Sequence, residues 1–430
     1  MFSRDRRTFL KQAAVMAGAF STNSLFAQAH AGEWTRANAA LGAATPEAAA
    51  QDEDYWSVIQ RAYSVNPNQN NLNNGGVSPA PIVVQEAVER YNKLSNEGPS
   101  YYMWRILDEG REPLREKLAA LAGVEPGEVA INRNSTEALN TVIYGLDLKR
   151  GDEVVGTKQD YPNMIAAYRQ RAMRDGIVYK QISLDFPIED DERIVKAFEA
   201  AMTPRTRLVH VTHMINWVGQ TLPVRKIADM AHAHGAEVLC DGAHSFGLMD
   251  FKVSDLGCDY FGTSLHKFLS APIGTGMLWI RTDKIAGVYP LTCNDKPLSG
   301  DIHKFETLGT RSFPLEQGIG EAVNFHEGIG AKRKEERIRY LKNYWASQVK
   351  GIPKVKLHTS LDARYSCAIC GVSVDGMTPA ELESALFNKY KIHTVGIVWE
   401  NIRCVRVTPH VYTTLADLDK LVRAIRTLAA

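Results

Sequence analysis

Strand-like runs alternate with helix-like segments between residues 128 and 280, and this alternation constrains the fold more than any other feature. The apolar runs "EVAINR", "DEVVGT", "IVYKQIS" and "TRLVHVTHM" each precede a stretch with helical spacing, such as "STEALNTVIYGL" or "VRKIADMAHAHG". "EVLCDGAHSFG", "CDYFGTSLHK" and "GTGMLWI" follow. Repeated units of this kind predict an α/β fold with a mostly parallel sheet between helices. Ligands of such sheets bind at the carboxyl ends of the strands.

The chain of 430 residues is long enough for more than one domain, because single hydrophobic cores stop growing near ~250–300 residues. We predict an N-terminal segment over residues 30–85, a large domain over residues 86–320 and a smaller C-terminal α+β domain over residues 321–430. Residues 33–74 are polar and read as irregular. They end in "NQNNLNNGGVSPAP", a turn-rich loop whose glycines allow a close approach to a ligand.

Residues 1–29 read as a targeting segment. "RDRRTFLK" precedes an uncharged stretch of small residues that closes on "AQA", which resembles a twin-arginine (Tat) signal. That resemblance implies export of the folded protein, a periplasmic location and a mature chain that begins near His30. The alternative, a transmembrane anchor, is disfavoured because the stretch is rich in Ala, Ser and Thr and contains Asn23. The mature form is therefore expected to have no membrane contact.

Charge and cysteine content narrow the possible partners. The 50 basic and 49 acidic residues leave a net charge of +1, so no strong field attracts nucleic acid or anionic lipid. Small molecules and other copies of the chain are the expected partners. The six cysteines form no disulfide framework. Cys367 and Cys370 spell C-x-x-C, but strand alternation sends their side chains to opposite faces, which favours core packing over a metal or redox role.

Polar residues stand where two neighbouring apolar strands stop. Asp241 and His244 follow one strand, and Ser264, His266 and Lys267 follow the next. A buried Asp or Lys costs several kcal/mol unless it is paired, so this grouping predicts a site. Desolvation and nearby positive charge lower the pKa of a lysine, and the free amine then forms a Schiff base with an aldehyde.

The aldehyde cofactor pyridoxal 5'-phosphate (PLP) needs three further groups. A carboxylate keeps its ring nitrogen protonated, hydroxyl and amide donors hold its phosphate, and a flat side chain packs on its ring. Asp241 supplies a candidate carboxylate. Ser135 and Thr136 begin a predicted helix, so their hydroxyls and the helix N-terminus are suited to a phosphate.

Several motifs together resemble one enzyme family. "DGAH" with Asp241, "SLHK" with Lys267, "NSTEALN", "LGT" and "VRVTPHVYTT" are similar to those of the class V aminotransferase family of fold-type I PLP enzymes, within it the isopenicillin N epimerase-like branch. The resemblance runs from about Asn73 to the C-terminus. It implies a seven-stranded sheet in the large domain, a homodimer and an amino acid substrate.

The resemblance also implies a role for each matched position. Lys267 looks like the lysine that links to PLP, and Asp241 like the partner of the ring nitrogen. The phenolic oxygen is contacted by His244 and Asn216, the ring is stacked by Tyr161, and the substrate α-carboxylate is clamped by Arg406. The phosphate is held by Ser264, His266, Ser135 and Thr136, and Thr310 reaches the phosphate of the neighbouring subunit.

Alternative functions remain open at this point. A metallohydrolase could use His232, His234, Asp241 and His244, but the two pairs should lie at opposite ends of one strand. Within the family, a cysteine desulfurase needs a nucleophilic cysteine before the arginine, and residues 371–403 contain none. Epimerases, aminotransferases and C–S or C–C lyases share the first steps. We favour epimerase or aminotransferase chemistry on the branch resemblance; an epimerase needs a second acid/base, for which Tyr161, Tyr101 and Tyr102 are candidates.

Overall fold

A seven-stranded sheet forms the centre of the protein, in a computed structural model that describes residues 25–430. Its strand order is β2-β8-β7-β6-β5-β3-β4, and only β8 runs antiparallel to its neighbours. The predicted, mostly parallel sheet is therefore confirmed. The strands are β2 Val129–Asn132, β3 Glu153–Thr157, β4 Val178–Ile182, β5 Thr206–Thr212, β6 Glu237–Asp241, β7 Tyr260–Ser264 and β8 Gly276–Ile280.

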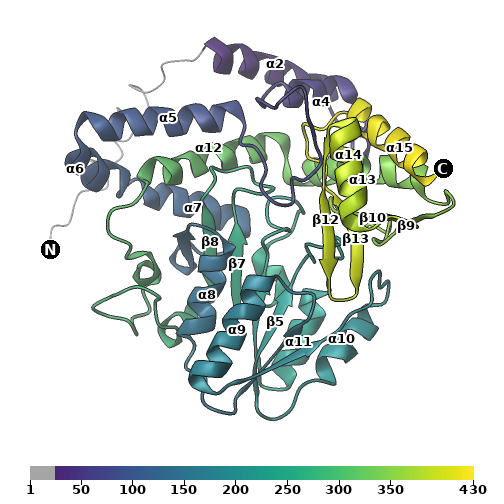
Figure 1. The fold of residues 1–430 in the computed structure, drawn as a ribbon. Helices are drawn as coiled ribbons and strands as arrows, with labels where there is room; N and C mark the ends of the chain where they lie inside the picture. The colour runs from purple at the N-terminus through teal and green to yellow at the C-terminus, as the bar shows by residue number, and fades with distance from the viewer. Residues whose placement is uncertain (1–24) are drawn as a thin grey trace.

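Helices cover both faces of this sheet (Figure 1). Because successive strand side chains alternate, Leu208 of β5 packs with α8 and α9 on one face, whereas Val209 and Val211 pack with α7, α10, α11 and α12 on the other. The covering helices are α5 Ile82–Glu97, α7 Arg111–Ala122, α8 Ser135–Gly145, α9 Pro162–Asp175, α10 Asp191–Glu199, α11 Val224–Ala233 and α12 Phe313–Ile329. Short helical turns are α6 Pro99–Tyr102, η1 Met103–Leu107, η2 Pro126–Glu128, η3 Val253–Leu256, η4 Thr282–Gly287 and η5 Ile302–Glu306.

The prediction of an irregular segment over residues 33–74 is wrong for its first half. This part contains α2 Leu25–Leu41, α3 Pro46–Ala49 and α4 Glu53–Gln60. The side chain of Asp52 caps α4 by accepting from the backbone N–H of Tyr55, and Trp56 is fully buried with its indole N–H donating to the carbonyl of Ala49. Packing of these few apolar residues stabilises helices that the polar composition does not predict.

The N-terminal targeting prediction falls mostly outside the described residues. Residues 1–24 lie outside them, and α2 runs across the predicted junction between residues 29 and 30. Across residues 25–430, no helix combines the length and the apolar content that spanning a membrane requires.

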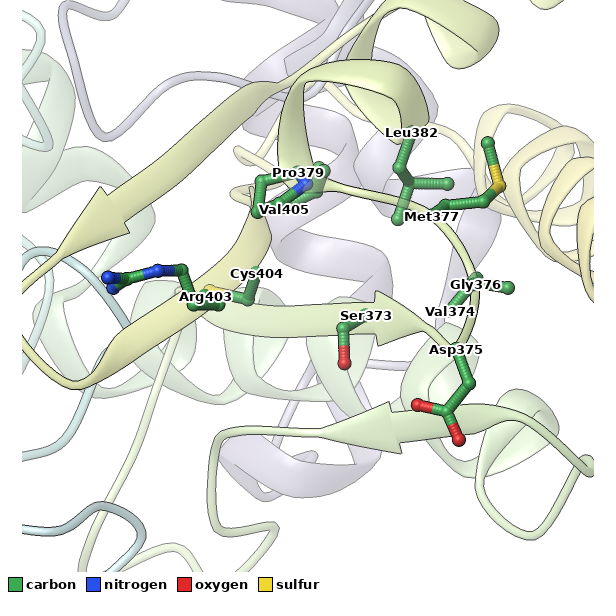
Figure 2. A pocket seen from close by; sticks show the side chains of 10 residues that line it. All are labelled: Ser373, Val374, Asp375, Gly376, Met377, Pro379, Leu382, Arg403, Cys404 and Val405. Carbon is green, nitrogen blue, oxygen red and sulfur yellow. The ribbon is translucent and has the colours of Figure 1, made fainter.

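A second, four-stranded antiparallel sheet lies in the C-terminal part, with the order β12-β13-β10-β9. A two-residue pairing of β1 Asn70–Asn71 with β11 Ile392–His393 ties the Asn-rich loop to this part. Residue 320, the predicted domain boundary, lies within α12. In the C-terminal part, a pocket of about 210 Å³ lies where β10 and β13 meet the start of α14 (Figure 2). The elements are β9 Val355–Leu357, β10 Cys370–Val374, β12 Val395–Trp399, β13 Ile402–Val407, α13 Ala331–Val349, α14 Pro379–Tyr390 and α15 Leu415–Ala429.

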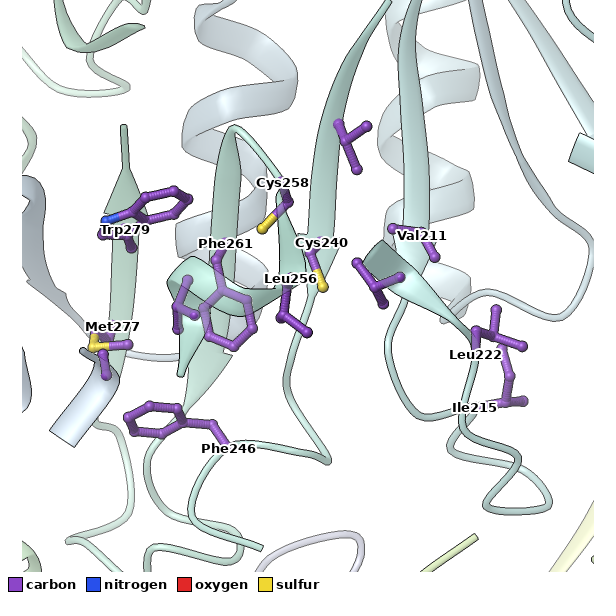
Figure 3. Close-up of a cluster of buried hydrophobic side chains, with 14 of the residues drawn as sticks. Val211, Ile215, Leu222, Cys240, Phe246, Leu256, Cys258, Phe261, Met277 and Trp279 are labelled. Atoms are coloured by element: carbon purple, nitrogen blue, oxygen red, sulfur yellow. The ribbon is translucent and has the colours of Figure 1, made fainter. Parts of the chain in front are cut away.

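The core is apolar beneath the edge of the large sheet where β6 and β7 end. Cys240, Phe246, Cys258 and Phe261 are all buried there (Figure 3). All six cysteines are free, and only Cys293 is exposed. Cys367 and Cys370 belong to two different core clusters, which agrees with the predicted packing on opposite sides.

Gly242, directly after Asp241, joins this core to the site. A Cβ added at Gly242 would lie 2.0 Å from Cζ of Phe261, so any side chain forces the ring or the strand end to move. We expect Gly242→Ala to lower the free energy of unfolding of the cofactor-free protein by about 1–3 kcal/mol in urea denaturation, the usual cost of overpacking.

Gly127→Ala is the matched control, because an added Cβ there meets nothing within 4 Å. It should change stability by no more than about 0.5 kcal/mol. If Gly242→Ala were as stable as the control, the close approach to Phe261 would not constrain this strand end.

Candidate functional site

The carboxyl ends of β6 and β7 and the N-terminus of α8 meet at one edge of the large sheet. Asp241 ends β6, Ser264 ends β7, and Ser135 is the first residue of α8. The Ser135 backbone N–H donates to Oγ of Ser264 at 2.9 Å, and the two Oγ atoms lie 3.0 Å apart. Two hydroxyls expected at a phosphate therefore stand together at a helix N-terminus, where anions are favoured.

Asp241 is buried and Lys267 is half-buried, and the two groups carry opposite charges. Burial raises the pKa of Asp241, and the nearby Lys267 and His210 partly oppose this shift. Burial lowers the pKa of Lys267 to about 8; the charge of Asp241 opposes this shift and that of Arg406 adds to it. The amine of Lys267 is thus partly neutral near physiological pH, which a nucleophilic lysine requires.

His244 links Lys267 to the Asn-rich loop. Its Nε2 lies 3.2 Å from Nζ of Lys267 and 2.8 Å from the carbonyl oxygen of Gly75. Burial, together with the charges of Lys267 and Arg406, holds the pKa of His244 well below its ordinary value. His244 is therefore neutral and lies directly against the reactive amine.

Arg406 reaches the same region from β13. It donates from Nη1 to the carbonyl oxygen of Asn216 at 3.0 Å and from Nη2 to Oδ1 of Asn73 at 2.8 Å. Burial lowers its pKa to about 10, so the guanidinium stays charged at neutral pH. A Cβ on Gly75 would lie 3.5 Å from Cζ of Arg406, so the glycine loop does approach this residue closely, as its composition indicates.

Several buried polar atoms near Arg406 lack a hydrogen-bond partner. Nε of Arg406, Oδ1 of Asn216 and Oγ1 of Thr408 are among them. Buried polar groups in native proteins are nearly always paired, so an unpaired donor and two unpaired acceptor-capable oxygens around one guanidinium indicate a ligand position.

The turn that carries Lys267 is supported from the C-terminal part. The buried Lys334 of α13 donates to the carbonyl oxygen of Phe268, and the ring of Phe268 stacks on that of His410 with centroids 6.0 Å apart. The Ser270 N–H donates to the carbonyl oxygen of Lys267 at 3.1 Å, and Ser270 adopts a positive φ of 60°. Sequence reasoning missed the supports from Lys334 and His410, because both residues lie more than fifty positions from Phe268.

The remaining predicted residues differ in their placement. His266 lies beside Lys267 with Nδ1 at 3.0 Å from the Thr275 carbonyl oxygen, and Thr136 is half-buried at the start of α8. Tyr161 precedes α9, is 40% exposed, and lies close enough to Arg406 to affect its pKa. Thr310 is exposed before α12 and forms no hydrogen bond with the other site residues within residues 25–430.

The histidines of the metallohydrolase alternative are separated. His232 Nε2 lies 2.8 Å from Oδ2 of Asp259, which also accepts from the N–H of Val238 at the start of β6. Asp241 and His244 lie at the other end of that strand, as the spacing predicts. Among the residues that the structure describes, no group of three His, Cys, Asp or Glu side chains could hold a metal ion.

The cysteines near Arg406 are unsuited to nucleophilic chemistry. Cys404 is buried at the pocket between β10, β13 and α14 (Figure 2), and burial raises the pKa of its thiol to about 12. Burial also raises the pKa of Cys367 to about 12 and that of Cys370 to about 11. These thiols stay protonated at neutral pH, and a thiol is a poor nucleophile.

A polar cavity of about 810 Å³ adjoins the site beyond Asn73. Asn73 Nδ2 lies 3.4 Å from Nε2 of His393, which also lines the cavity, while Oδ1 of Asn73 binds Arg406. Amide side chains from the Asn-rich loop and hydroxyl side chains from the region before α15 also line the cavity, among them Asn66, Asn68, Gln69, Thr413 and Thr414, together with the apolar Val65, Pro67, Val77 and Pro79.

The model of the aminotransferase class-V family matches residues 71–421, so the chain belongs to this family. Isopenicillin N epimerase of Amycolatopsis lactamdurans is 27% identical over 393 residues, which cover 87% of this chain and 98% of that protein. A probable cysteine desulfurase of Halalkalibacterium halodurans is 30% identical over 297 residues, 64% of this chain and 70% of that protein.

Solved structures agree in fold. The cystine C–S lyase C-DES, in complex with cysteine persulfide, superposes with a TM-score of 0.76 at 23% identity and covers 84% of this chain and 98% of that chain. The cysteine desulfurase of Thermococcus onnurineus gives the same TM-score at 21% identity, over 87% of this chain and 98% of that chain. The fold is that of the fold-type I PLP enzymes.

The cofactor of this family, PLP, fits the residues at the sheet edge. Asp241 offers a buried carboxylate, Lys267 an amine of lowered pKa, and Ser135 and Ser264 hydroxyls at a helix N-terminus. The unpaired Oδ1 of Asn216 adds a polar atom that a ligand can use. When bound, PLP supplies an aldehyde carbon and a ring that withdraws electrons from the α-carbon of an amino acid.

The lowered pKa of Lys267 predicts how its reaction with PLP depends on pH. Apoprotein is mixed with PLP between about pH 6 and 10 and reduced with borohydride, and the modified peptide is quantified by mass spectrometry. Because the neutral amine reacts, the rate of modification at Lys267 should rise through a midpoint near pH 8.

An exposed lysine would instead give a midpoint at about pH 10.4. Lys267→Ala serves as the blank and should show no modification of this peptide. A midpoint above pH 10 for Lys267 would contradict the desolvated environment.

Proposed function

We propose that this protein is a PLP-dependent enzyme that acts at the α-carbon of an amino acid, with epimerase or aminotransferase chemistry. The observation that carries the proposal is the grouping of Lys267, His244 and Asp241 at one strand edge, opposite the charged Arg406 with its unpaired Nε. Removal of an α-proton from an amino acid needs an amine base, an anchor for the carboxylate and an electron sink, and these residues supply or hold each of them.

Each residue has a distinct role in the proposal. Arg406 binds the substrate α-carboxylate through two donors, and this contact displaces the amide oxygen of Asn73. The Nζ of Lys267 would remove the α-proton of the substrate. His244, which is neutral and 3.2 Å away, orients that amine. Asp241 holds a proton on the ring nitrogen of the cofactor.

The two favoured reactions differ in how the proton returns. Aminotransfer needs only Lys267, whereas epimerisation needs a second acid on the opposite face. Tyr161 is the best candidate, because it lies close enough to Arg406 to affect the pKa of that guanidinium. Tyr101 is 61% exposed and its ring lies against Tyr102 on α6, so neither of these tyrosines is supported as the second acid.

A persulfide-forming desulfurase is not supported by the cysteines. The thiols nearest Arg406 are buried, with raised pKa values, and the exposed Cys293 lies in the loop before η5.

Two further proposals accompany the function: a homodimer in which Thr310 reaches the partner's phosphate, and export to the periplasm on a Tat-type signal. Measurement of the molecular mass in solution tests the homodimer, and cell fractionation tests the export to the periplasm.

The function is tested by following the α-proton. The PLP-loaded protein is incubated with L- and D-amino acids in deuterated water, and NMR records the α-proton and the chirality of the product. Exchange with inversion supports an epimerase, and release of a keto acid with cofactor amination supports an aminotransferase. No exchange with any amino acid would overturn the proposal.

The proposed binding of the substrate α-carboxylate by Arg406 predicts the effect of removing its charge. Arg406→Gln keeps hydrogen-bonding capacity but removes the charged clamp, so kcat/KM should fall about 100-fold, or ~3 kcal/mol, chiefly through KM. Arg403→Gln on the same strand is the control, because Arg403 is exposed and donates only to backbone carbonyls of its own turn. Equal losses in both variants would contradict the role of Arg406.

A further inference from the structure

A second buried carboxylate, Asp160, lies beside Asp241 at the same edge of the sheet. Its Oδ1 accepts from Oγ1 of Thr212 at 2.9 Å, and Thr212 of β5 is the register partner of Asp241 on β6. Asp160 directly precedes Tyr161, the residue expected to pack on the cofactor ring. Two carboxylates therefore lie at or just after the ends of β3 and β6, the two strands that flank β5, and only Asp241 has a role so far.

Only neutral donors hold Asp160. Thr157 donates its N–H to Oδ2 at 2.7 Å and its hydroxyl to Oδ1 at 2.8 Å, and Thr212 completes the set. Within residues 25–430, no basic side chain forms an ion pair with Asp160, although it is fully buried. A buried carboxylate without a cation costs free energy, and burial accordingly raises the pKa of Asp160 to about 6.

We propose that Asp160 is a positioning residue of the cofactor site: it fixes the turn that carries Tyr161 and adds negative charge behind Asp241, which helps keep the ring nitrogen of PLP protonated. The proposal rests on the PLP site described above. Its structural basis is the bonding of one carboxylate to β3 through Thr157 and to β5 through Thr212.

The electrostatic effect in this proposal follows from the ionisable groups that lie near Asp160. These are Asp241 of β6, Tyr168 of α9 and Tyr179 of β4, and the charge of Asp160 acts on the pKa of each of them. An anion that makes Asp241 hold a proton more tightly has the same effect on a cationic ring nitrogen bound to Asp241. His210 of β5 acts on the pKa of Asp241 in the opposite sense, but burial lowers the pKa of His210 to about 4, so it is neutral at pH 7.5 and does not cancel the charge of Asp160.

Asp160→Asn separates this role from a purely structural one. Asparagine keeps the volume, and its amide oxygen still accepts from the hydroxyls of Thr157 and Thr212, but it carries no charge. Its NH2 group cannot accept from the Thr157 N–H, a loss that removal of the buried charge outweighs at pH 7.5. Since the pKa of Asp160 is raised from 3.8 to about 6 on folding, its stabilising contribution is complete below pH 3.8 and is lost as pH rises through 6. At pH 7.5 the variant apoprotein should therefore be at least as stable as the wild type.

The affinity for PLP should change in the opposite direction. We expect the Kd of the apoprotein for PLP, measured by fluorescence titration at pH 7.5, to rise about tenfold in Asp160→Asn. The pH midpoint of the absorbance of the bound cofactor should move to lower pH, since one negative charge is gone. Asp147→Asn, which removes an exposed carboxylate on the surface, should alter neither quantity.

Each outcome decides between the possibilities. Weaker PLP binding with undiminished apoprotein stability supports the proposal. Unchanged PLP affinity overturns it, and so does a parallel loss of stability and affinity, which would show a structural role only. If the wild-type protein itself fails to bind PLP through Lys267, the proposed function fails instead, and the two failures are thereby distinguished.

Discussion

Burial of opposite charges at the carboxyl edge of a parallel sheet is the constraint on which the rest of the site depends. Asp241 and Lys267 shift one another's pKa values toward their charged forms, while burial shifts both toward neutrality. Neither group would be tolerated there alone. The turn of Lys267 is accordingly fixed from several sides, by Lys334 under Phe268, by the stacked ring of His410 and by the Ser270 N–H.

Much of this arrangement was predictable from sequence because it depends on local patterns. Apolar runs with helical stretches between them locate all seven strands of the large sheet, and the polar residues that follow β6 and β7 locate Asp241, Ser264 and Lys267. The rule that parallel strands bring their carboxyl ends to one edge then places these residues together. No knowledge of distant contacts was needed for these steps.

The missed features depend on contacts between distant segments. The helices of residues 25–60 form because Trp56 and its neighbours are buried, and nothing in their polar composition indicates that burial. Asn73 and Gly75 have their roles only because the loop folds against Arg406 and His244, more than 160 residues away. No local pattern marks Asp160, because its role depends on the bonding of its carboxylate to Thr157 and Thr212, which only the structure shows.

The same desolvation acts in opposite senses on amines and thiols, and this favours one kind of chemistry at the site. Burial favours neutral forms, so it increases the fraction of Lys267 that is a free amine and keeps Cys404 as an unreactive thiol. A nucleophilic cysteine needs an exposed, electropositive setting, which the strand next to Arg406 does not provide. The Asp241, Lys267 and Arg406 arrangement can serve epimerases and desulfurases alike. The buried surroundings of the cysteines, rather than these three residues, support the proposal of proton transfer at the α-carbon over persulfide formation.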